Sequence, residues 1–192
     1  GQARRDHAFP SPEVRPSVVV TTRAMDFAAL EAKAAKGVAV ITQPDNRWGR
    51  CDIKTVGLLS NALAKQAARE AGAYEAWFVD DMDLVTEGSS TNAWIVDAEG
   101  RLRTRDTNAN ILRGITRSSL IELTREAGVE LSEKPFTVAE AQAAREAFLT
   151  SASAFVTPIV AVDGKNIGDG RPGPVTSRLR ALYLEHARRT AQ

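Results

Sequence analysis

Short β-branched and apolar runs, each ended by a turn signal, constrain the fold of this chain more than any other feature of its sequence. Strands are predicted for seven such runs, at residues 17–22, 37–42, 74–79, 92–96, 101–104, 147–150 and 155–162. Asp97-Ala98-Glu99-Gly100 joins two of them as a hairpin, and Asp163-Gly164 marks another turn. Because strands outnumber helices and several neighbours are joined by short turns, we predict a mixed or largely antiparallel sheet.

Helical periodicity interrupts this pattern at several places. Helices are predicted at residues 60–71, 116–127, 137 onward and 174–189, while the alanine-rich stretch 26–36 is open between a short helix and an extended connection. Gly72 and Gly128 stand where a left-handed residue commonly ends a helix, and Thr116 is the expected N-cap of the second helix. Thr137 and Glu140 match a capping box. The sequence therefore indicates an α/β protein.

The composition excludes several classes of protein. Of the 192 residues, 43% are hydrophobic and 26% charged, which is ordinary for a chain that buries a core. The net charge of +1 gives no sign of binding to nucleic acid or to an anionic membrane, and no stretch is apolar for long enough to span a bilayer. Two histidines and one cysteine leave little for a zinc site, and the lone Cys51 favours a reducing compartment. We therefore expect a cytoplasmic protein with no metal, nucleic-acid or membrane partner.

Lys54 is the first candidate for chemistry. It ends an alternating segment, residues 47–54, that is interpreted as a strand with Lys54 and Asp52 on one face and Cys51 and Ile53 on the other. A lysine in a partly desolvated pocket can form a Schiff base with a carbonyl group. A solvated surface lysine is the alternative, and spacing alone favours it.

For three further groups of residues, the sequence allows both a functional and an ordinary structural interpretation. Small hydroxyl residues surround Glu87 in the stretch 86–92, which could place a carboxylate against a cationic ring nitrogen or form a polar turn. Gly114-Ile115-Thr116 opens a helix whose free N–H groups suit a phosphate, although every helix has such an end. Arg5 and His7 share one face of an extended segment and could bind a carboxylate, or simply belong to a solvated charged stretch.

Taken in order, these segments resemble the fold-type-IV (class IV) pyridoxal-phosphate enzymes, and among them the D-amino acid aminotransferases in particular. The matching stretches are residues 5–10, 50–54, 63–72, 85–92, 110–117, 148–153 and 156–160. Each stretch is a weak signal, whereas seven in family order are specific. The resemblance implies a mixed, largely antiparallel sheet curled into a pseudo-barrel with flanking helices, and pyridoxal 5'-phosphate as cofactor.

The resemblance also implies roles for the residues that bind the cofactor. Lys54 matches the lysine that forms the internal aldimine and later moves the substrate proton, and Glu87 matches the carboxylate at the pyridine nitrogen. Ile115 and Thr116 match the helix start that binds the phosphate, while Leu112 matches an apolar residue against the ring. Ser151, Ala152 and Ser153 match a second phosphate-side loop, where the family often has threonine at the middle position.

On the substrate side, Arg5 and His7 match the pair that holds the α-carboxylate in the D-amino acid enzymes. The implied reaction is ping-pong transamination of a D-amino acid with a 2-oxo acid acceptor, expected to be 2-oxoglutarate, in a homodimer. Residues 1–22 are interpreted as the end of a small N-terminal domain and its connection, and residues 23–192 as the large cofactor-binding domain. Most of the small domain, with its phosphate-binding arginine and substrate-side aromatic residue, is expected to be missing from this sequence.

Three alternatives remain open at this stage. Branched-chain aminotransferases and aminodeoxychorismate lyases share the fold and the cofactor. Branched-chain aminotransferases usually differ from Ser90-Thr91-Asn92 in the sequence that follows Glu87-Gly88. A truncated, inactive remnant that serves as a dimerisation module is the alternative from outside enzymology.

Overall fold

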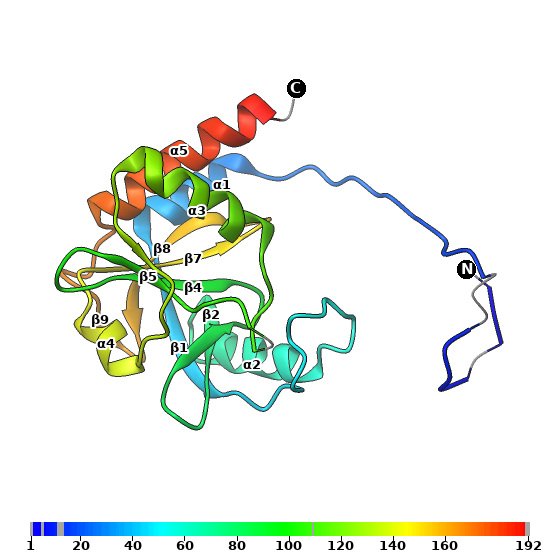
Figure 1. The fold of residues 1–192 in the computed structure, drawn as a ribbon. Helices are drawn as coiled ribbons and strands as arrows, with labels where there is room; N and C mark the ends of the chain where they lie inside the picture. The colour runs from blue at the N-terminus through cyan, green and yellow to red at the C-terminus, as the bar shows by residue number, and fades with distance from the viewer. Residues whose placement is uncertain (1, 5, 11–13, 109, 191–192) are drawn as a thin grey trace.

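The computed structural model describes residues 2–4, 6–10, 14–108 and 110–190, which form one sheet flanked by helices (Figure 1). The helices are α1 (Phe27–Lys36), α2 (Leu59–Glu70), α3 (Ile115–Ala127), α4 (Val138–Ala143) and α5 (Pro174–Thr190). The strands are β1 (Val38–Pro44), β2 (Glu75–Val79), β3 (Val85–Gly88), β4 (Asn92–Val96), β5 (Leu102–Thr104), β6 (Leu131–Ser132), β7 (Glu146–Ser151), β8 (Phe155–Val162) and β9 (Lys165–Asn166).

The sheet is mixed, as the sequence predicted. Its strand order is β3-β2-β1-β8-β7-β4-β5-β6, with β9 paired to β8. Neighbours that are joined by short turns, such as β4 with β5 and β7 with β8, are antiparallel, whereas β1 pairs in parallel with both β2 and β8. The predicted α/β class with a largely antiparallel sheet and flanking helices is confirmed.

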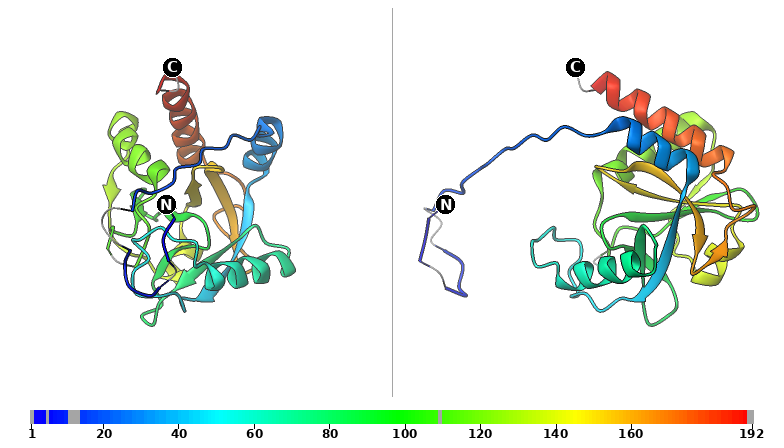
Figure 2. Two further views of the ribbon diagram at one scale, coloured as in Figure 1. Left: turned by 90° about the vertical axis from the view of Figure 1, so that its right-hand side faces the viewer. Right: turned by 180° about the vertical axis from the view of Figure 1, so that it is seen from behind.

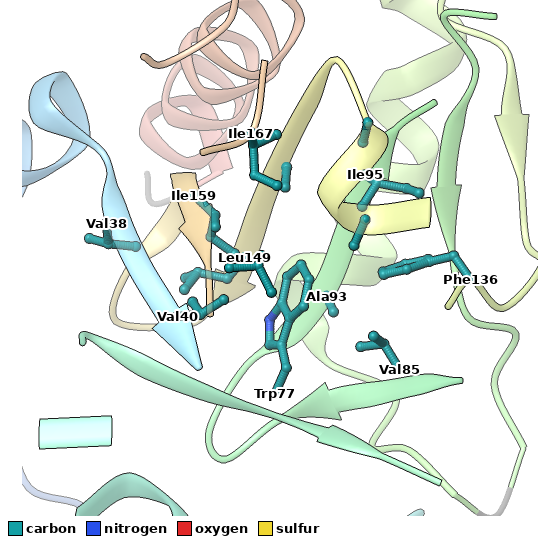
Figure 3. Close-up of a cluster of buried hydrophobic side chains, with 14 of the residues drawn as sticks. Val38, Val40, Trp77, Val85, Ala93, Ile95, Phe136, Leu149, Ile159 and Ile167 are labelled. Carbon is teal, nitrogen blue, oxygen red and sulfur yellow. The ribbon is translucent and has the colours of Figure 1, made fainter. Parts of the chain in front are cut away.

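Strand alternation divides the core between the two faces of the sheet. Ile95 packs on one face, whereas its neighbours Trp94 and Val96 pack on the other. The first face holds Trp77 and Phe136 at an edge-to-face angle of 62° with 5.9 Å between their ring centroids (Figure 3). The second face is covered by α3 and α5. Both faces carry buried side chains, and the loops at the strand ends are left to form a site.

Helices α1 and α5 lie side by side (Figure 2). Arg180 of α5 donates to Glu31 of α1 at 2.7 Å and to the carbonyl oxygen of Val156 in β8 at 2.6 Å. The alanine-rich stretch that was left open is thus helical, and Asp26 caps it by accepting from the backbone N–H of Ala29 at 2.9 Å. Within the described part of the chain, no helix combines the length and apolar character needed to cross a lipid bilayer.

Two predicted strands are wrong. Residues 17–22 form no strand, and Val18, Val19 and Val20 are more than four-fifths exposed on an extended segment that leaves the body of the protein (Figure 1). These valines have β propensity without a sheet edge to pair with, and propensity alone does not form a strand. Residues 47–54 form turns between β1 and α2 instead of a strand, because Asp45 accepts from the backbone N–H of Arg47 at 3.3 Å and bends the chain after β1.

Helix ends agree with the sequence except at one residue. Gly128 ends α3 with a φ of 63°, as predicted, and Thr137 and Glu140 form the predicted capping box. Thr116 is not the N-cap of α3, because the helix begins earlier and Gly114 occupies that position. The Thr116 hydroxyl faces Tyr183 instead, at 3.3 Å.

Candidate functional site

A cavity of about 1190 Å³ opens where four connecting segments meet. These segments are the β1–α2 connection, the β3–β4 turn, the chain leading into α3, and the β7–β8 turn. All eight residues to which the sequence assigned cofactor binding line this one cavity. They are Lys54, Glu87, Leu112, Ile115, Thr116, Ser151, Ala152 and Ser153.

Lys54 reaches the cavity from the β1–α2 connection and is solvent-exposed. Nearby in the same segment, Cys51 also lines the cavity, and its thiol donates to the carbonyl oxygen of Trp48 at 3.1 Å. Burial raises the pKa of the Cys51 thiol, which disfavours the thiolate form. Lys54 thus places a primary amine at the cavity.

Glu87 of β3 is 6% exposed and is held by donors from three segments. Arg47 Nη1 donates to Oε1 at 2.5 Å, Asn92 Nδ2 donates to Oε2 at 3.1 Å, and the backbone N–H of Leu112 reaches both oxygens at 3.1 and 3.2 Å. Burial raises the pKa of the Glu87 carboxyl to about 7, although the charge and hydrogen bond of Arg47 act in the opposite direction. The site thus contains a fixed carboxyl group that titrates near neutral pH.

Arg47 is a site residue that the sequence did not single out. Its side chain is 5% exposed, and Nε and Nη2 donate to the two carboxylate oxygens of Asp45 at 2.8 and 2.7 Å. Nη2 also donates to the carbonyl oxygen of Asn110, and the guanidinium lies 4.5 Å from the ring centroid of Phe78. The only sequence feature that pointed to Arg47 was its position two residues after the oppositely charged Asp45, directly after strand β1.

The start of α3 presents backbone N–H groups to the cavity. Gly114 is the N-cap and makes no side-chain hydrogen bond to the helix, so the first N–H groups of α3 keep their capacity to bind an anion. A Cβ atom at Gly114 would lie 2.3 Å from Asn92 Oδ1, so a glycine is needed for the helix to start this close to β4. Ile115 is exposed at this end and Thr116 is buried.

The β7–β8 turn, residues 151–154, faces the same cavity. Ser151 Oγ accepts from the backbone N–H of Ala154 at 3.0 Å, which tightens the turn. Ala152 and Ser153 are exposed at its tip. Ser153 can offer a hydroxyl, whereas Ala152 can offer only its backbone N–H. Two segments with N–H groups therefore border one cavity that also contains a lysine.

The β3–β4 turn is fixed from behind by Glu75 of β2, which is fully buried. Glu75 accepts hydrogen bonds from Ser89 Oγ and from Ser90 Oγ, the latter at 2.9 Å, and Lys65 Nζ lies 3.3 Å from it. Thr91 Oγ1 is buried and has no hydrogen-bond partner among the described residues.

Comparison with known proteins places this geometry in a family. The family model for amino-transferase class IV matches residues 1–162. The chain belongs to the class IV aminotransferases. Its mixed sheet with flanking helices is the fold-type-IV architecture that the resemblance implied.

Individual class IV aminotransferases show how far this likeness extends. The chain is 41% identical over 188 residues to the D-alanine aminotransferase of Staphylococcus aureus (strain N315), which covers 97% of this chain and 64% of that protein. The identity to the D-alanine aminotransferase of Bacillus licheniformis is 39% over 180 residues, covering 94% and 62%. Among solved structures, the branched-chain aminotransferase of Thermoproteus uzoniensis with norvaline aligns with a TM-score of 0.70 at 32% identity, covering 78% of this chain and 51% of that one.

A second solved structure, a branched-chain amino acid aminotransferase with pyridoxamine 5'-phosphate, aligns with a TM-score of 0.74 at 36% identity. The alignment covers 81% of this chain and 52% of that one. The chain thus spans less than two thirds of the length of these relatives.

Of the two residues predicted to bind substrate in this class IV aminotransferase, only His7 belongs to the part of the chain that the structure describes. Arg5 lies outside the described residues. His7 is exposed on the segment that leaves the body, and it does not line the cavity. The described chain therefore brings the predicted cofactor residues together, but not His7.

Proposed function

We propose that this chain is the cofactor-carrying part of a pyridoxal-5'-phosphate-dependent transaminase that acts on D-amino acids. The observation that carries the proposal is that a lysine, a buried carboxyl group and two N–H-bearing turns share one cavity. These groups match the aldehyde, the ring nitrogen and the phosphate of pyridoxal phosphate. The start of α3, which has no side-chain cap, also fits an anionic ligand.

When bound, the cofactor would supply an electron-withdrawing ring for a substrate amine. Lys54 Nζ would hold the cofactor covalently and, once released, would act as the general acid/base that moves the proton at the substrate α-carbon. Glu87 would hold the ring nitrogen by charge and hydrogen bond. The backbone N–H groups of Ile115 and Thr116, with the turn at residues 151–153, would hold the phosphate, and Leu112 would pack against the ring.

The substrate proposal is a D-amino acid with 2-oxoglutarate as the acceptor. The 41% identity to a D-alanine aminotransferase supports it, as does the Arg5-Asp6-His7 sequence expected to hold the α-carboxylate. Because His7 is remote from the cavity of its own protomer, these side chains would have to reach a cavity in the assembled protein. We therefore propose a cytoplasmic homodimer, in which residues 1–22 connect to a small N-terminal domain and residues 23–192 form the large domain.

Branched-chain amino acids are the second candidate substrate, favoured by the TM-score of 0.74 with a branched-chain aminotransferase. The experiment is a comparison of turnover with D-alanine, L-leucine and aminodeoxychorismate, using Lys54→Ala as the blank. The proposal predicts turnover of D-alanine alone, and a loss of that turnover in Arg5→Ala. Turnover of L-leucine in place of D-alanine would contradict the substrate, and so would full D-alanine activity in Arg5→Ala.

The whole protein is the sample for this comparison. Turnover of aminodeoxychorismate would indicate a lyase. An absence of cofactor uptake, together with an absence of turnover on all three compounds, would favour the inactive dimerisation module.

A further inference from the structure

Asp45, Arg47 and Glu87 form a charge cluster in which two carboxylates share one guanidinium. The side chains are 11%, 5% and 8% exposed, so little water screens their interaction. Thr86 Oγ1 closes the cluster by donating to Asp45 Oδ2 at 2.7 Å. If all three groups are ionised, the cluster has one negative charge that no residue within it balances.

We propose that Asp45 and Arg47 are positioning residues that set the charge of Glu87 for a cationic ring nitrogen. Arg47 favours the ionised form of the buried Glu87, and Asp45 offsets part of the positive charge of Arg47. The inference rests on the proposed function, because the ring nitrogen belongs to the cofactor that Lys54 would hold. Neither Asp45 nor Arg47 is assigned to contact substrate or cofactor.

The division of hydrogen bonds supports this arrangement. Arg47 directs two nitrogens of its fork at Asp45 and one, Nη1, at Glu87 Oε1. The other oxygen, Glu87 Oε2, accepts from Asn92 Nδ2 and the Leu112 N–H, which are uncharged donors. Within the described residues, Oε2 therefore accepts no hydrogen bond from a cation, and it is the oxygen that we assign to the ring nitrogen.

The two charged neighbours act on Glu87 in opposite directions. The charge of Arg47 lowers the pKa of the Glu87 carboxyl, whereas the charge of Asp45 raises it. The other ionisable groups around the cavity are Lys54, Cys51 and Arg113, and Glu75 lies behind the β3–β4 turn. None of these four groups is hydrogen-bonded to Glu87 in the described residues, so removal of Asp45 or Arg47 tests the cluster itself.

The test measures the titration of Glu87 in the cofactor-free protein by NMR of side-chain ¹³C-labelled glutamate, with Glu87→Gln to assign the signal. We expect a midpoint near the pKa of about 7 in the wild type. Arg47→Met should move the midpoint up by about one pH unit or more, and Asp45→Asn should move it down. Arg47→Lys should give a midpoint below that of Arg47→Met.

Arg103→Met is the matched control, because Arg103 pairs with Glu140 on α4 and does not line the cavity. It should leave the Glu87 midpoint unchanged. Circular dichroism checks that each variant is folded. If Arg47→Met does not fold, the test uses the shift of the Glu87 midpoint in Asp45→Asn alone. A midpoint that stays at the wild-type value in the folded variants, or moves in the same direction in both, would overturn the inference.

A second measurement concerns the ring nitrogen in the loaded protein. With ¹⁵N-labelled pyridoxal phosphate, Asp45→Asn should lower the pH at which the ring nitrogen loses its proton, because the cluster then has no spare negative charge. If Asp45→Asn binds the cofactor normally and the ring nitrogen loses its proton at the same pH as in the wild type, the role of Asp45 is overturned. If the wild-type protein binds no pyridoxal phosphate, the proposed function is contradicted instead. The titration of the Glu87 carboxyl still measures the effects of Arg47 and Asp45 on Glu87.

Discussion

Asn92 Nδ2 donates to Glu87 Oε2 at 3.1 Å, so the first residue of β4 fixes the carboxylate at the end of β3. The same nitrogen donates to the carbonyl oxygen of Leu112 at 2.9 Å. One buried amide thereby joins the carboxylate to the chain that leads into α3. The proposed ring-nitrogen and phosphate sites are held at a fixed separation by this contact.

Asn92→Ala should therefore loosen both sites together. We expect a loss of about 1–3 kcal/mol in the free energy of unfolding, because buried acceptors lose their donor. We also expect weaker uptake of pyridoxal phosphate. Chemical denaturation and cofactor titration measure the two effects, and Asn166→Ala, which removes an exposed amide on β9, is the control. Equal behaviour of the two variants would contradict this role for Asn92.

Gly114→Ala should disturb the start of α3. The new Cβ would lie 2.3 Å from Asn92 Oδ1, so the helix start or Asn92 must move. We expect a cost of about 1–3 kcal/mol in unfolding free energy and a lower affinity for inorganic phosphate and for pyridoxal phosphate. Gly49→Ala is the matched control, because nothing lies within 4 Å of a Cβ there. Wild-type phosphate affinity in Gly114→Ala would count against the helix start as an anion site.

The raised pKa of Glu87 has a consequence for stability. Folding moves this carboxyl from an ordinary pKa of 4.5 to about 7, so the folded state binds more protons between these values. The free energy of unfolding should therefore fall as pH rises from about 4.5 to about 7, by up to about 3 kcal/mol, and then level off. Denaturation as a function of pH should show a flatter profile for Glu87→Gln than for the wild type. Parallel profiles would show that Glu87 does not titrate in this range.

Glu75→Gln should weaken the support of the β3–β4 turn. Glu75 accepts from Ser89 and Ser90 and lies 3.3 Å from Lys65 Nζ, and an amide would lose part of this set. We expect a loss of about 1–3 kcal/mol in unfolding free energy. Glu70→Gln, at an exposed position on α2, is the control. A Glu75→Gln chain as stable as the control would show that the serine contacts contribute little.

The sequence predicted the parts of the fold that local signals determine. The hairpin of β4 and β5, the glycine at the end of α3 and the capping box at Thr137 depend on residues within a few positions of one another. The valines at 18–20 have the same local propensity as a strand, but the outcome depends on whether a sheet edge is nearby. Local pattern cannot supply that information.

The candidate site shows the same division. Lys54 and Glu87 were found because family resemblance supplied their roles, and the structure then brought them to one cavity. Arg47 was missed because its burial depends on Thr86, Glu87 and Asn110, which lie 39 to 63 residues further along the chain. The strand β3 was also missed, since its hydroxyl-rich sequence suggested a polar turn.

The most direct test of the account is whether pyridoxal phosphate attaches to Lys54. The wild-type protein and Lys54→Ala are incubated with the cofactor, reduced with borohydride and digested, and the modified peptide is identified by mass spectrometry. The account predicts a visible absorption band in the wild type that D-alanine bleaches and L-alanine does not, with the label on Lys54. A whole protein that develops no band, or that carries the label equally in Lys54→Ala, would contradict it.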